Sequence, residues 1–174
     1  MSEQVTVGVS VVVPEPHATV LSSWRRRVGD PQAGLVWPHV TLLPPTVVPV
    51  EEMGAAKAHL AGVAAAHVPF EMHLSGTGTF RPRSPVVYVQ VARGVADCEA
   101  LERAIRTGPL ARALEFPYHP HVTIAQDVPD AALDAAYTGL AGLTVRFEVA
   151  GFTLCERSEA GRWAACADYA LGGR

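Results

Sequence analysis

Two stretches of this chain carry the same four residues, Pro38-His39-Val40-Thr41 and Pro120-His121-Val122-Thr123. An apolar residue follows each of them, Leu42 in the first and Ile124 in the second. In a β-strand, residues two apart point to the same face, so each histidine projects beside its threonine while the valine between them points the other way. The two tetrapeptides therefore predict two equivalent strands, and the sequence around them indicates an internal repeat.

The residues before each tetrapeptide follow the same order. Val5–Val11 and Pro85–Val91 alternate or cluster apolar residues as strands do. A helical pattern follows each strand. The first places Arg25 to Arg27 mostly on its polar face and ends at Gly29-Asp30-Pro31, and the second ends at Gly108-Pro109. This agreement indicates that the tetrapeptides occupy the same place in two copies of one unit.

The repeat continues after the tetrapeptides. Apolar residues at helical spacing occur over 53–63 in the first half and over 133–140 in the second. A strand pattern follows each, over 68–74 and 145–149, and both strands contain a Phe-Glu pair. Each unit is thus predicted to run strand, helix, His-Val-Thr strand, helix, strand.

The order of these elements favours one fold class. Strands and helices mix without a long β-α alternation, and Gly/Pro turns join several strands, including a hairpin over 152–171 that turns at 158–162. We expect a duplicated, pseudo-twofold, two-lobed α+β fold with mostly antiparallel sheets, outer helices and a central cleft. The chain is predicted to be one domain over 1–174, with approximate lobes 1–84 and 85–174 that can exchange strands.

Composition limits the function classes. The chain has 174 residues, of which 49% are hydrophobic and 18% charged, which is typical of a globular protein. A net charge of −3 argues against a protein that coats nucleic acid, because such binding needs many Lys and Arg contacts to phosphate. The three cysteines have no C-x-x-C spacing, so neither a disulfide framework nor a cysteine-built zinc site is expected. The apolar run near the start is too short to span a membrane, so we expect a cytoplasmic protein with no membrane partner and no obligate protein partner.

A single His-x-Thr match carries no weight, because about 0.4 matches are expected by chance in a chain of this composition. His17-Ala18-Thr19 also fits this pattern, and His73-Leu74-Ser75 fits a looser version. The first lies at a predicted helix start, where Thr19 is suited to capping, and the second lies on a predicted strand. We interpret both as structural and assign function to the longer, duplicated tetrapeptide alone.

The chemistry of the paired residues points to a phosphate ester. An imidazole titrates near neutral pH and can give or take a proton. A hydroxyl beside it can donate a hydrogen bond to a phosphate oxygen. In-line displacement at phosphorus needs a base on the entering oxygen and an acid on the leaving one. His39 and His121 would supply these two groups, Thr41 and Thr123 would hold the phosphate, and the chemistry calls for neither a metal nor another cofactor.

On these residues the sequence resembles the 2H phosphoesterase superfamily, in particular the bacterial 2′-5′ RNA ligase or RNA 2′,3′-cyclic phosphodiesterase-like proteins. The resemblance implies a duplicated α+β fold with a cleft between its lobes. It implies that His39 and His121 are the acid–base pair and that Thr41 and Thr123 bind phosphate. It also implies opening of 2′,3′-cyclic phosphates of RNA ends or nucleotides to 2′-phosphates, with 2′-5′ RNA ligation as a related activity. We assign His121 as base and His39 as acid, although the symmetry makes these roles exchangeable.

The sequence departs from this family in two places. Members of the RNA-ligase-like branch often carry an arginine soon after the second motif, where this chain reads Ile124-Ala125-Gln126-Asp127. The first motif runs into Leu43-Pro44-Pro45, with no basic residue nearby. Both departures weaken the expectation of strong RNA-end binding. Arg81 and Arg83 are the remaining basic candidates for the mouth of the groove, with solvated turn residues as the alternative.

Three further residues are candidate substrate contacts. His119 lies two residues before His121 and can share its face, either touching substrate or lying at the rim. Tyr118 and Trp37 closely precede their motifs and could stack on a base, whereas core packing is the competing interpretation.

Three other functions compete with the RNA-end phosphodiesterase. A metal-dependent hydrolase could use His39, His119 and His121, although it would lack the carboxylates such sites usually add. A non-enzymatic module could bind a phosphorylated nucleotide or RNA terminus, although binding alone does not require two titrating groups. A small-molecule phosphodiesterase for cyclic nucleotides or ADP-ribose cyclic phosphate would use the same residues, and the acidic charge balance suits it.

Overall fold

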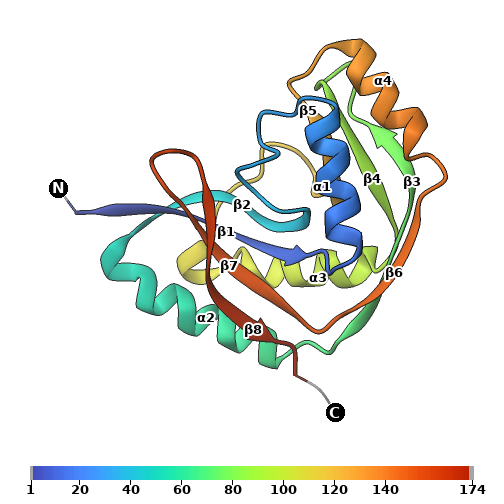
Figure 1. Cartoon of the computed structure of the whole chain (residues 1–174). Coiled ribbons are helices and arrows are strands. Elements are labelled where there is room, and N and C mark those ends of the chain that lie inside the picture. Colours follow the sequence, from blue (N-terminus) through green and yellow to red (C-terminus); the bar gives the residue numbers. More distant parts are fainter. Residues whose placement is uncertain (1, 173–174) are drawn as a thin grey trace.

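A computed structural model of the protein describes residues 2–172. Figure 1 shows its strands and helices along the chain. In order, these elements are β1 (Gln4–Val12), α1 (His17–Arg27), β2 (His39–Pro49), the 3-10 helix η1 (Val50–Glu52), α2 (Met53–Ala65), β3 (Phe70–Thr79), β4 (Val86–Arg93), α3 (Val95–Ile105), the 3-10 helix η2 (Gly108–Leu110), β5 (His121–Gln126), α4 (Asp130–Gly139), β6 (Thr144–Val149), β7 (Gly151–Arg157) and β8 (Trp163–Ala170).

The described strands form two antiparallel sheets of four, in the orders β2-β1-β7-β8 and β5-β4-β3-β6. The strands that begin with the two histidines, β2 and β5, lie at corresponding edges of their sheets. Each pairs with the first strand of its own repeat, β2 with β1 and β5 with β4. The predicted duplicated α+β fold with antiparallel sheets is confirmed.

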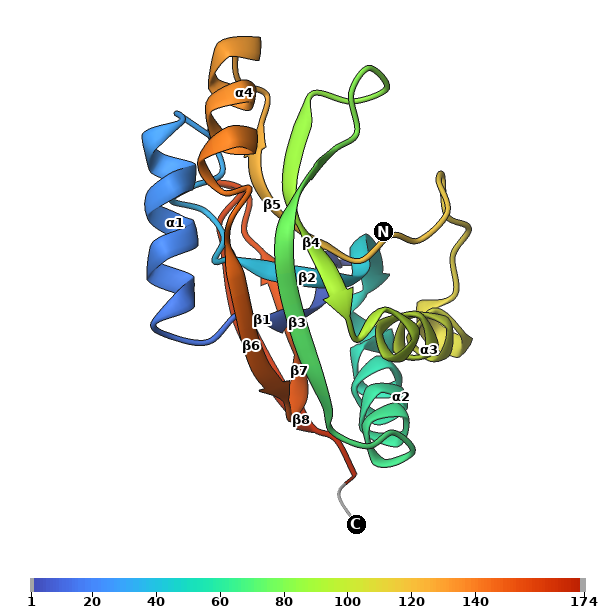
Figure 2. The same ribbon diagram turned by 90° about the vertical axis from the view of Figure 1, so that its right-hand side faces the viewer.

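The two halves of the sequence are interleaved in space. Strand β3, which ends the first repeat, lies between β4 and β6, whereas the last hairpin, β7–β8, completes the sheet of β1 and β2. The helices cross over as well, because α1 contacts β5 and α3 contacts β2. Figure 2 shows α1 and α4 on one side of the strands and α2 and α3 on the other. Each histidine-bearing strand is therefore in contact with a helix from the other repeat.

The two histidine strands have the same pattern of burial over their first five residues. In β2, His39 and Thr41 are half-buried while Val40, Leu42 and Leu43 are in the core. The first five residues of β5 repeat this alternation, with its histidine and threonine half-buried. The apolar side chains fix the register because a slip of one residue would turn the whole buried set toward solvent. Because the apolar residues are buried on one face, the histidine and threonine of each strand lie on the other.

Helix α1 departs from its expected pattern at Arg25. Arg26 and Arg27 are exposed as predicted, but Arg25 is only 3% exposed. Its Nε and Nη2 atoms donate to Oδ2 of Asp30 at 3.1 and 2.9 Å, and Asp30 itself is buried. The expectation that Arg25 lies on the polar face is wrong, because the turn after the helix folds a carboxylate back onto it.

Cys98, Cys155 and Cys166 are free thiols, and the first two are buried. Burial raises the pKa of Cys98 to about 12 and that of Cys155 to about 11, so both stay protonated at neutral pH. Within residues 2–172, no helix combines the length and apolar character needed to cross a membrane.

Candidate active site

The two imidazoles are anchored in the same way. Nδ1 of His39 lies 2.7 Å from the carbonyl oxygen of Trp37, and Nδ1 of His121 lies 2.6 Å from that of His119. A carbonyl oxygen only accepts hydrogen bonds, so in both rings Nδ1 carries the proton and donates it. In both rings Nε2 is thereby left for chemistry, as a base when the ring is neutral and as an acid when it is protonated. The two histidines, which the repeat predicts to be equivalent, thus make the same hydrogen bond to the backbone.

The two histidines border adjoining pockets. His39 lines a pocket of about 140 Å³, and His121 lines a second one of about 250 Å³. Thr41 lines both, and strands β2 and β5 contact one another, so the two pockets adjoin at the cleft between the histidine-bearing strands. Thr123 is half-buried on the same face of β5 as His121. The structure thus places His39, Thr41 and His121 around two adjoining pockets, whereas Thr123 lines neither of them.

Burial lowers the pKa of both histidines. For His39, desolvation is the main cause, opposed by the hydrogen bond to Trp37 and assisted by the positive charge of Arg25. For His121, desolvation again dominates, opposed by its bond to the His119 carbonyl and assisted by the charges of His119 and His39. Each imidazole is therefore held in its neutral form at neutral pH more firmly than in water. Because the charge of His39 lowers the pKa of His121, protonation of His39 disfavours protonation of His121.

An aromatic cluster surrounds His121. The ring of Phe80 lies edge-on to His121 at 5.0 Å between centroids, and the ring of Tyr88 lies at 5.1 Å. His119 is stacked at 6.1 Å and lines the same pocket, which fits its predicted position on the face of His121. These rings limit the rotation of the imidazole and exclude water from one side of it.

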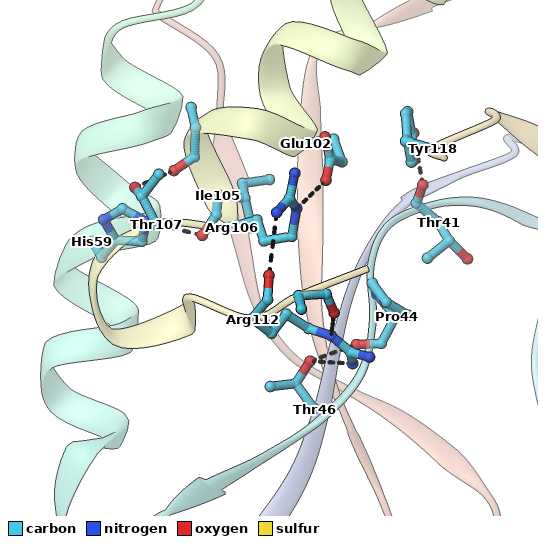
Figure 3. Close-up of polar contacts among 12 residues, drawn as sticks. Thr41, Pro44, Thr46, His59, Glu102, Ile105, Arg106, Thr107, Arg112 and Tyr118 are labelled. Atoms are coloured by element: carbon cyan, nitrogen blue, oxygen red, sulfur yellow. Dashed lines mark hydrogen bonds and ion pairs between the residues drawn. The ribbon is translucent and has the colours of Figure 1, made fainter. Parts of the chain in front are cut away.

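A loop from the second repeat is tied to the first histidine strand. The hydroxyl of Tyr118 donates to the carbonyl oxygen of Thr41 at 2.8 Å, as Figure 3 shows. In the same loop, Nη1 of Arg112 donates to the carbonyl of Pro45 at 2.7 Å and to Oγ1 of Thr46 at 3.1 Å. Tyr118 packs against the core and its hydroxyl is used structurally, so the core interpretation of this residue fits better than stacking on a base.

Trp37 lies at the pocket beside His39. Its carbonyl orients the imidazole, and its side chain is half-buried and lines the pocket. Its Nε1 atom is the one buried side-chain nitrogen or oxygen within residues 2–172 that has no hydrogen-bond partner. Trp37 remains a candidate substrate contact.

The two candidate arginines have different surroundings. Arg81 forms an ion pair with Asp134 of α4 at 2.9 Å and lies 3.9 Å from Asp130, so its charge is directed to a helix and not to the cleft. The guanidinium of Arg83 lies over the ring of Phe116, 5.3 Å from its centroid. Phe116 lines the pocket of His121, which leaves Arg83 as a candidate at the rim of the cleft.

The two incomplete motifs have structural roles. The backbone N–H and the hydroxyl of Thr19 both donate to the carboxylate of Glu15, at 3.2 and 2.8 Å, which caps the start of α1 after His17. Nε2 of His73 is hydrogen-bonded to Oγ1 of Thr144 at 2.8 Å, linking β3 to β6. Neither histidine lines the cleft.

Several residues of the site were not singled out by the sequence. Trp163 and Phe116 line the two pockets, and Arg112 lines the pocket of His121. Trp163 follows the predicted turn at 158–162, but its place beside His39 depends on pairing between β7 and β1, which are far apart in the chain. Phe116, 50% exposed, is a large apolar side chain in a loop next to a motif, which is the one local signal that could have marked it.

Within residues 2–172 the side chains offer acid–base chemistry but no preformed metal site. In the described part of the chain, no three His, Cys, Asp or Glu side chains are grouped so as to hold a metal ion. The arrangement His39, His119 and His121 considered from the sequence is thus not assembled as a ligand set. Two histidines with free Nε2 atoms and two hydroxyl groups could act together on a phosphate placed at the junction of the pockets.

Comparison with protein families and curated proteins yields consistent matches. A family model described as the 2′-5′ RNA ligase superfamily matches residues 13–161. A protein of Geobacillus kaustophilus named "Putative phosphoesterase" is 28% identical over 169 residues, covering 96% of this chain and 96% of its own length. A protein of Bacillus cytotoxicus with the same description is 31% identical over 121 residues, covering 70% of each.

Solved structures share the fold over almost the whole chain. LigT of E. coli in complex with NADP+ gives a TM-score of 0.76 at 23% identity, covering 98% of this chain and 99% of that one. Its complex with ATP gives 0.73 at 25% identity, covering 97% and 99%. TT0787 of Thermus thermophilus gives 0.63 at 22% identity, covering 97% and 99%. These likenesses show the two-lobed fold.

Proposed function

The chain belongs to the 2′-5′ RNA ligase superfamily, and from this premise we propose that it is a phosphoesterase that opens 2′,3′-cyclic phosphates to 2′-phosphates without a metal ion. The observation that carries the proposal is the matched anchoring of His39 and His121. Each ring donates from Nδ1 to the backbone two residues earlier, which leaves Nε2 free, and each histidine lines one of two adjoining pockets. One phosphate between them would have a proton acceptor on one side and a proton donor on the other.

The proposed reaction is a displacement by water at phosphorus. Nε2 of the neutral histidine takes a proton from water as the water oxygen bonds to phosphorus. Nε2 of the protonated histidine gives its proton to the ribose oxygen as the bond between that oxygen and phosphorus breaks. The hydroxyls of Thr41 and Thr123 would donate to the non-bridging oxygens, which carry the charge that develops. The lowered pKa of both rings favours this, because one stays neutral readily and the other gives up its proton readily.

The surroundings of the cleft favour a nucleotide or the last nucleotide of an RNA over a long strand. Arg81 is paired with Asp134, and Arg112 is bound to β2 through Pro45 and Thr46, so neither is directed at a polyanion. The residues 124–127, which follow the second motif, contain no arginine, although one is common there in the ligase-like branch. For E. coli LigT, complexes with 3′-AMP and with phosphate support a nucleotide-sized ligand in this fold. Ligation of 2′-5′ linkages and hydrolysis of small cyclic phosphates are further activities that the same residues could support.

Hydrolysis assays with matched histidine variants test this proposal. The substrates are the four nucleoside 2′,3′-cyclic monophosphates, a short RNA with a 2′,3′-cyclic end and ADP-ribose cyclic phosphate, with products separated by chromatography. His39→Ala and His121→Ala should each lower kcat by about 10²-fold or more. His17→Ala and His73→Ala, from the incomplete motifs, should stay within about twofold of the unmodified protein because neither lines the cleft.

Two results would contradict the proposal. One is that either His39→Ala or His121→Ala, shown by circular dichroism to be folded, retains full activity on every substrate that the unmodified protein cleaves. The other is that EDTA abolishes the activity and a divalent metal restores it, because the proposed chemistry uses side chains alone.

A further inference from the structure

The cleft is asymmetric although the strands that form it are equivalent. Thr41 pairs with Ser10 of β1, whereas Thr123 pairs with Tyr88 of β4. The Tyr88 ring packs against His121 and fills the space beside it. Ser10 and Gly8, which share one face of β1, have small side chains or none, and both line the hollow beside His39. At equivalent positions the repeat thus has an aromatic ring beside His121 and a small side chain beside His39.

Two tryptophans form walls of this pocket. Trp37 lies in the segment just before β2, and Trp163 begins β8. The Trp163 ring lies against Gly8, since a Cβ atom built on that glycine would be 3.3 Å from it. The other lining residues are mostly aliphatic, among them Leu43. The pocket therefore offers flat apolar faces next to the imidazole of His39.

The walls are fixed to one another by the backbone. The N–H of Trp163 donates to the carbonyl of Leu35 at 2.9 Å, and Nη1 of Arg162 donates to the carbonyl of Gly34 at 3.2 Å. These bonds join the β7–β8 hairpin to the segment that carries Trp37. The pocket is thus formed before any ligand arrives, which reduces the entropy lost on binding.

The size and chemistry of the pocket suit one planar ring system. Its volume of about 140 Å³ is well below the roughly 300 Å³ and upward of pockets that take a whole drug-sized ligand. Aromatic side chains bind nucleobases by stacking on their faces. Trp37 also has a buried indole N–H without an acceptor, which a small side-chain shift could offer to a base. A charged phosphate would find no such match among these apolar walls.

We infer that the pocket between Trp37 and Trp163 binds the base of the nucleoside whose ribose carries the cyclic phosphate. This inference rests on the proposed function and extends it by giving the substrate a direction. With the nucleoside on the side of His39, the leaving ribose oxygen faces His39, which gives it a proton. Water enters from the other pocket, where His121 takes its proton. Purine and pyrimidine nucleotides should therefore be better substrates than cyclic phosphates that lack a base.

The test compares a substrate with a base and one without. The assay measures kcat/KM for adenosine 2′,3′-cyclic phosphate and for glycerol 1,2-cyclic phosphate with Trp163→Ala, which removes a wall, and with Gly8→Val, which fills the pocket. Each variant should lose about tenfold or more on the nucleotide and less than about twofold on the glycerol compound. Phe116→Ala, in the pocket of His121, is the matched control and should leave the ratio of the two substrates unchanged.

A binding measurement separates this inference from the proposed function. Adenosine 2′-monophosphate, titrated into the unmodified protein, should change the tryptophan emission, and Trp163→Ala should weaken its affinity about tenfold. This holds even if no cyclic phosphate is hydrolysed, in which case the proposed function fails and the pocket assignment stands. The inference is overturned if folded Trp163→Ala and Gly8→Val bind the monophosphate as tightly as the unmodified protein, or if Phe116→Ala alone alters the ratio of the substrates.

Discussion

The hydroxyl of Tyr118 donates a hydrogen bond of 2.8 Å to the carbonyl oxygen of Thr41, which joins the loop before one histidine to the strand that carries the other. Thr41 belongs to the first motif, and Tyr118 lies three residues before His121. The tyrosine ring packs against the core, so the bond is held in place by apolar contacts. Together with the bonds from Arg112 to Pro45 and Thr46, this side chain holds one half of the site against the other.

Replacing Tyr118 with Phe removes this bond and leaves the ring. The free energy of unfolding should fall by about 1 kcal/mol, which is typical of the loss of one such hydrogen bond. We expect kcat to fall as well, since a small displacement between acid and base slows both proton transfers. Urea unfolding and steady-state kinetics measure the two effects. Tyr137→Phe, on the exposed face of α4, is the control.

Asp30 neutralises a buried arginine behind the site. It accepts two hydrogen bonds from Arg25 and one from the N–H of Gln32 at 2.8 Å, and the charge of Arg25 acts on His39. Asp30→Asn should lower the free energy of unfolding by about 3 kcal/mol, because it leaves a buried charge without its counter-charge. The unneutralised charge should also lower the pKa of His39 further.

Denaturant unfolding and titration of the histidine ring by NMR check this prediction. Arg26→Ala, one residue further along the same helix but exposed, should change the stability by less than about 0.5 kcal/mol. An Asp30→Asn protein as stable as the unmodified one would show that the ion pair is dispensable.

Local pattern in the sequence was enough for the order of the elements. The strands and helices follow the predicted order because each is specified by apolar residues at a period of two or of about 3.6. The alternation of half-buried and buried residues in β2 and β5 follows from the same rule. It could therefore be predicted that His39 and Thr41 lie on one face of their strand, and that His121 and Thr123 do the same.

Features that depend on long-range packing could not be predicted. Arg25 lies among charged residues on a helix and was expected on its polar face, but Asp30 folds back to bury it. The position of Trp163 beside His39 depends on the hairpin β7–β8 joining the sheet of β1 and β2. The periodicity of apolar residues within a strand does not indicate that β7 pairs with β1. The asymmetry between Ser10 and Tyr88 is visible only once the register of both sheets is known.

The pH dependence of activity follows from the two lowered pKa values. The proposed chemistry needs one neutral and one protonated histidine, so kcat/KM should follow a bell whose limbs are the two macroscopic pKa values of the pair. Because burial lowers the pKa of both rings, the optimum should lie below pH 6.5, the ordinary pKa of an imidazole. An optimum above pH 7.5 would contradict this.

His119→Gln should move one limb of that bell. The charge of His119 contributes to the lowered pKa of His121, while the anchoring bond comes from the backbone of residue 119 and persists in the variant. The pKa of His121 should therefore rise and that of His39 should change little. NMR titration of both rings in the unmodified and variant proteins measures this, and an equal shift of both would argue for a general change in the cleft.

The stability of the fold should also depend on the two histidines. A ring whose pKa is lower in the folded state than in the unfolded state favours folding above the unfolded pKa, and this contribution is lost as the pH falls through the folded pKa. The free energy of unfolding should thus decrease as the pH is lowered from about 7 through 6.5 and beyond. In His39→Gln this decrease should be smaller, because one of the two groups no longer binds a proton. Urea unfolding at a series of pH values compares the two slopes.

The direction of the reaction can be tested by changing the leaving atom. If His39 protonates the leaving ribose oxygen, its loss should matter less when that atom is sulfur, because a thiol has a pKa of about 8.5 and leaves as a thiolate without a proton. A uridine cyclic phosphate with sulfur at the 3′ bridging position should therefore restore most of the activity of His39→Ala. His121→Ala should stay inactive, since water still needs a base. Release of the thiol, followed with a thiol-reactive dye, gives the rate. Rescue of His121→Ala in place of His39→Ala would reverse the direction and place the nucleoside on the side of Phe116 and Arg83.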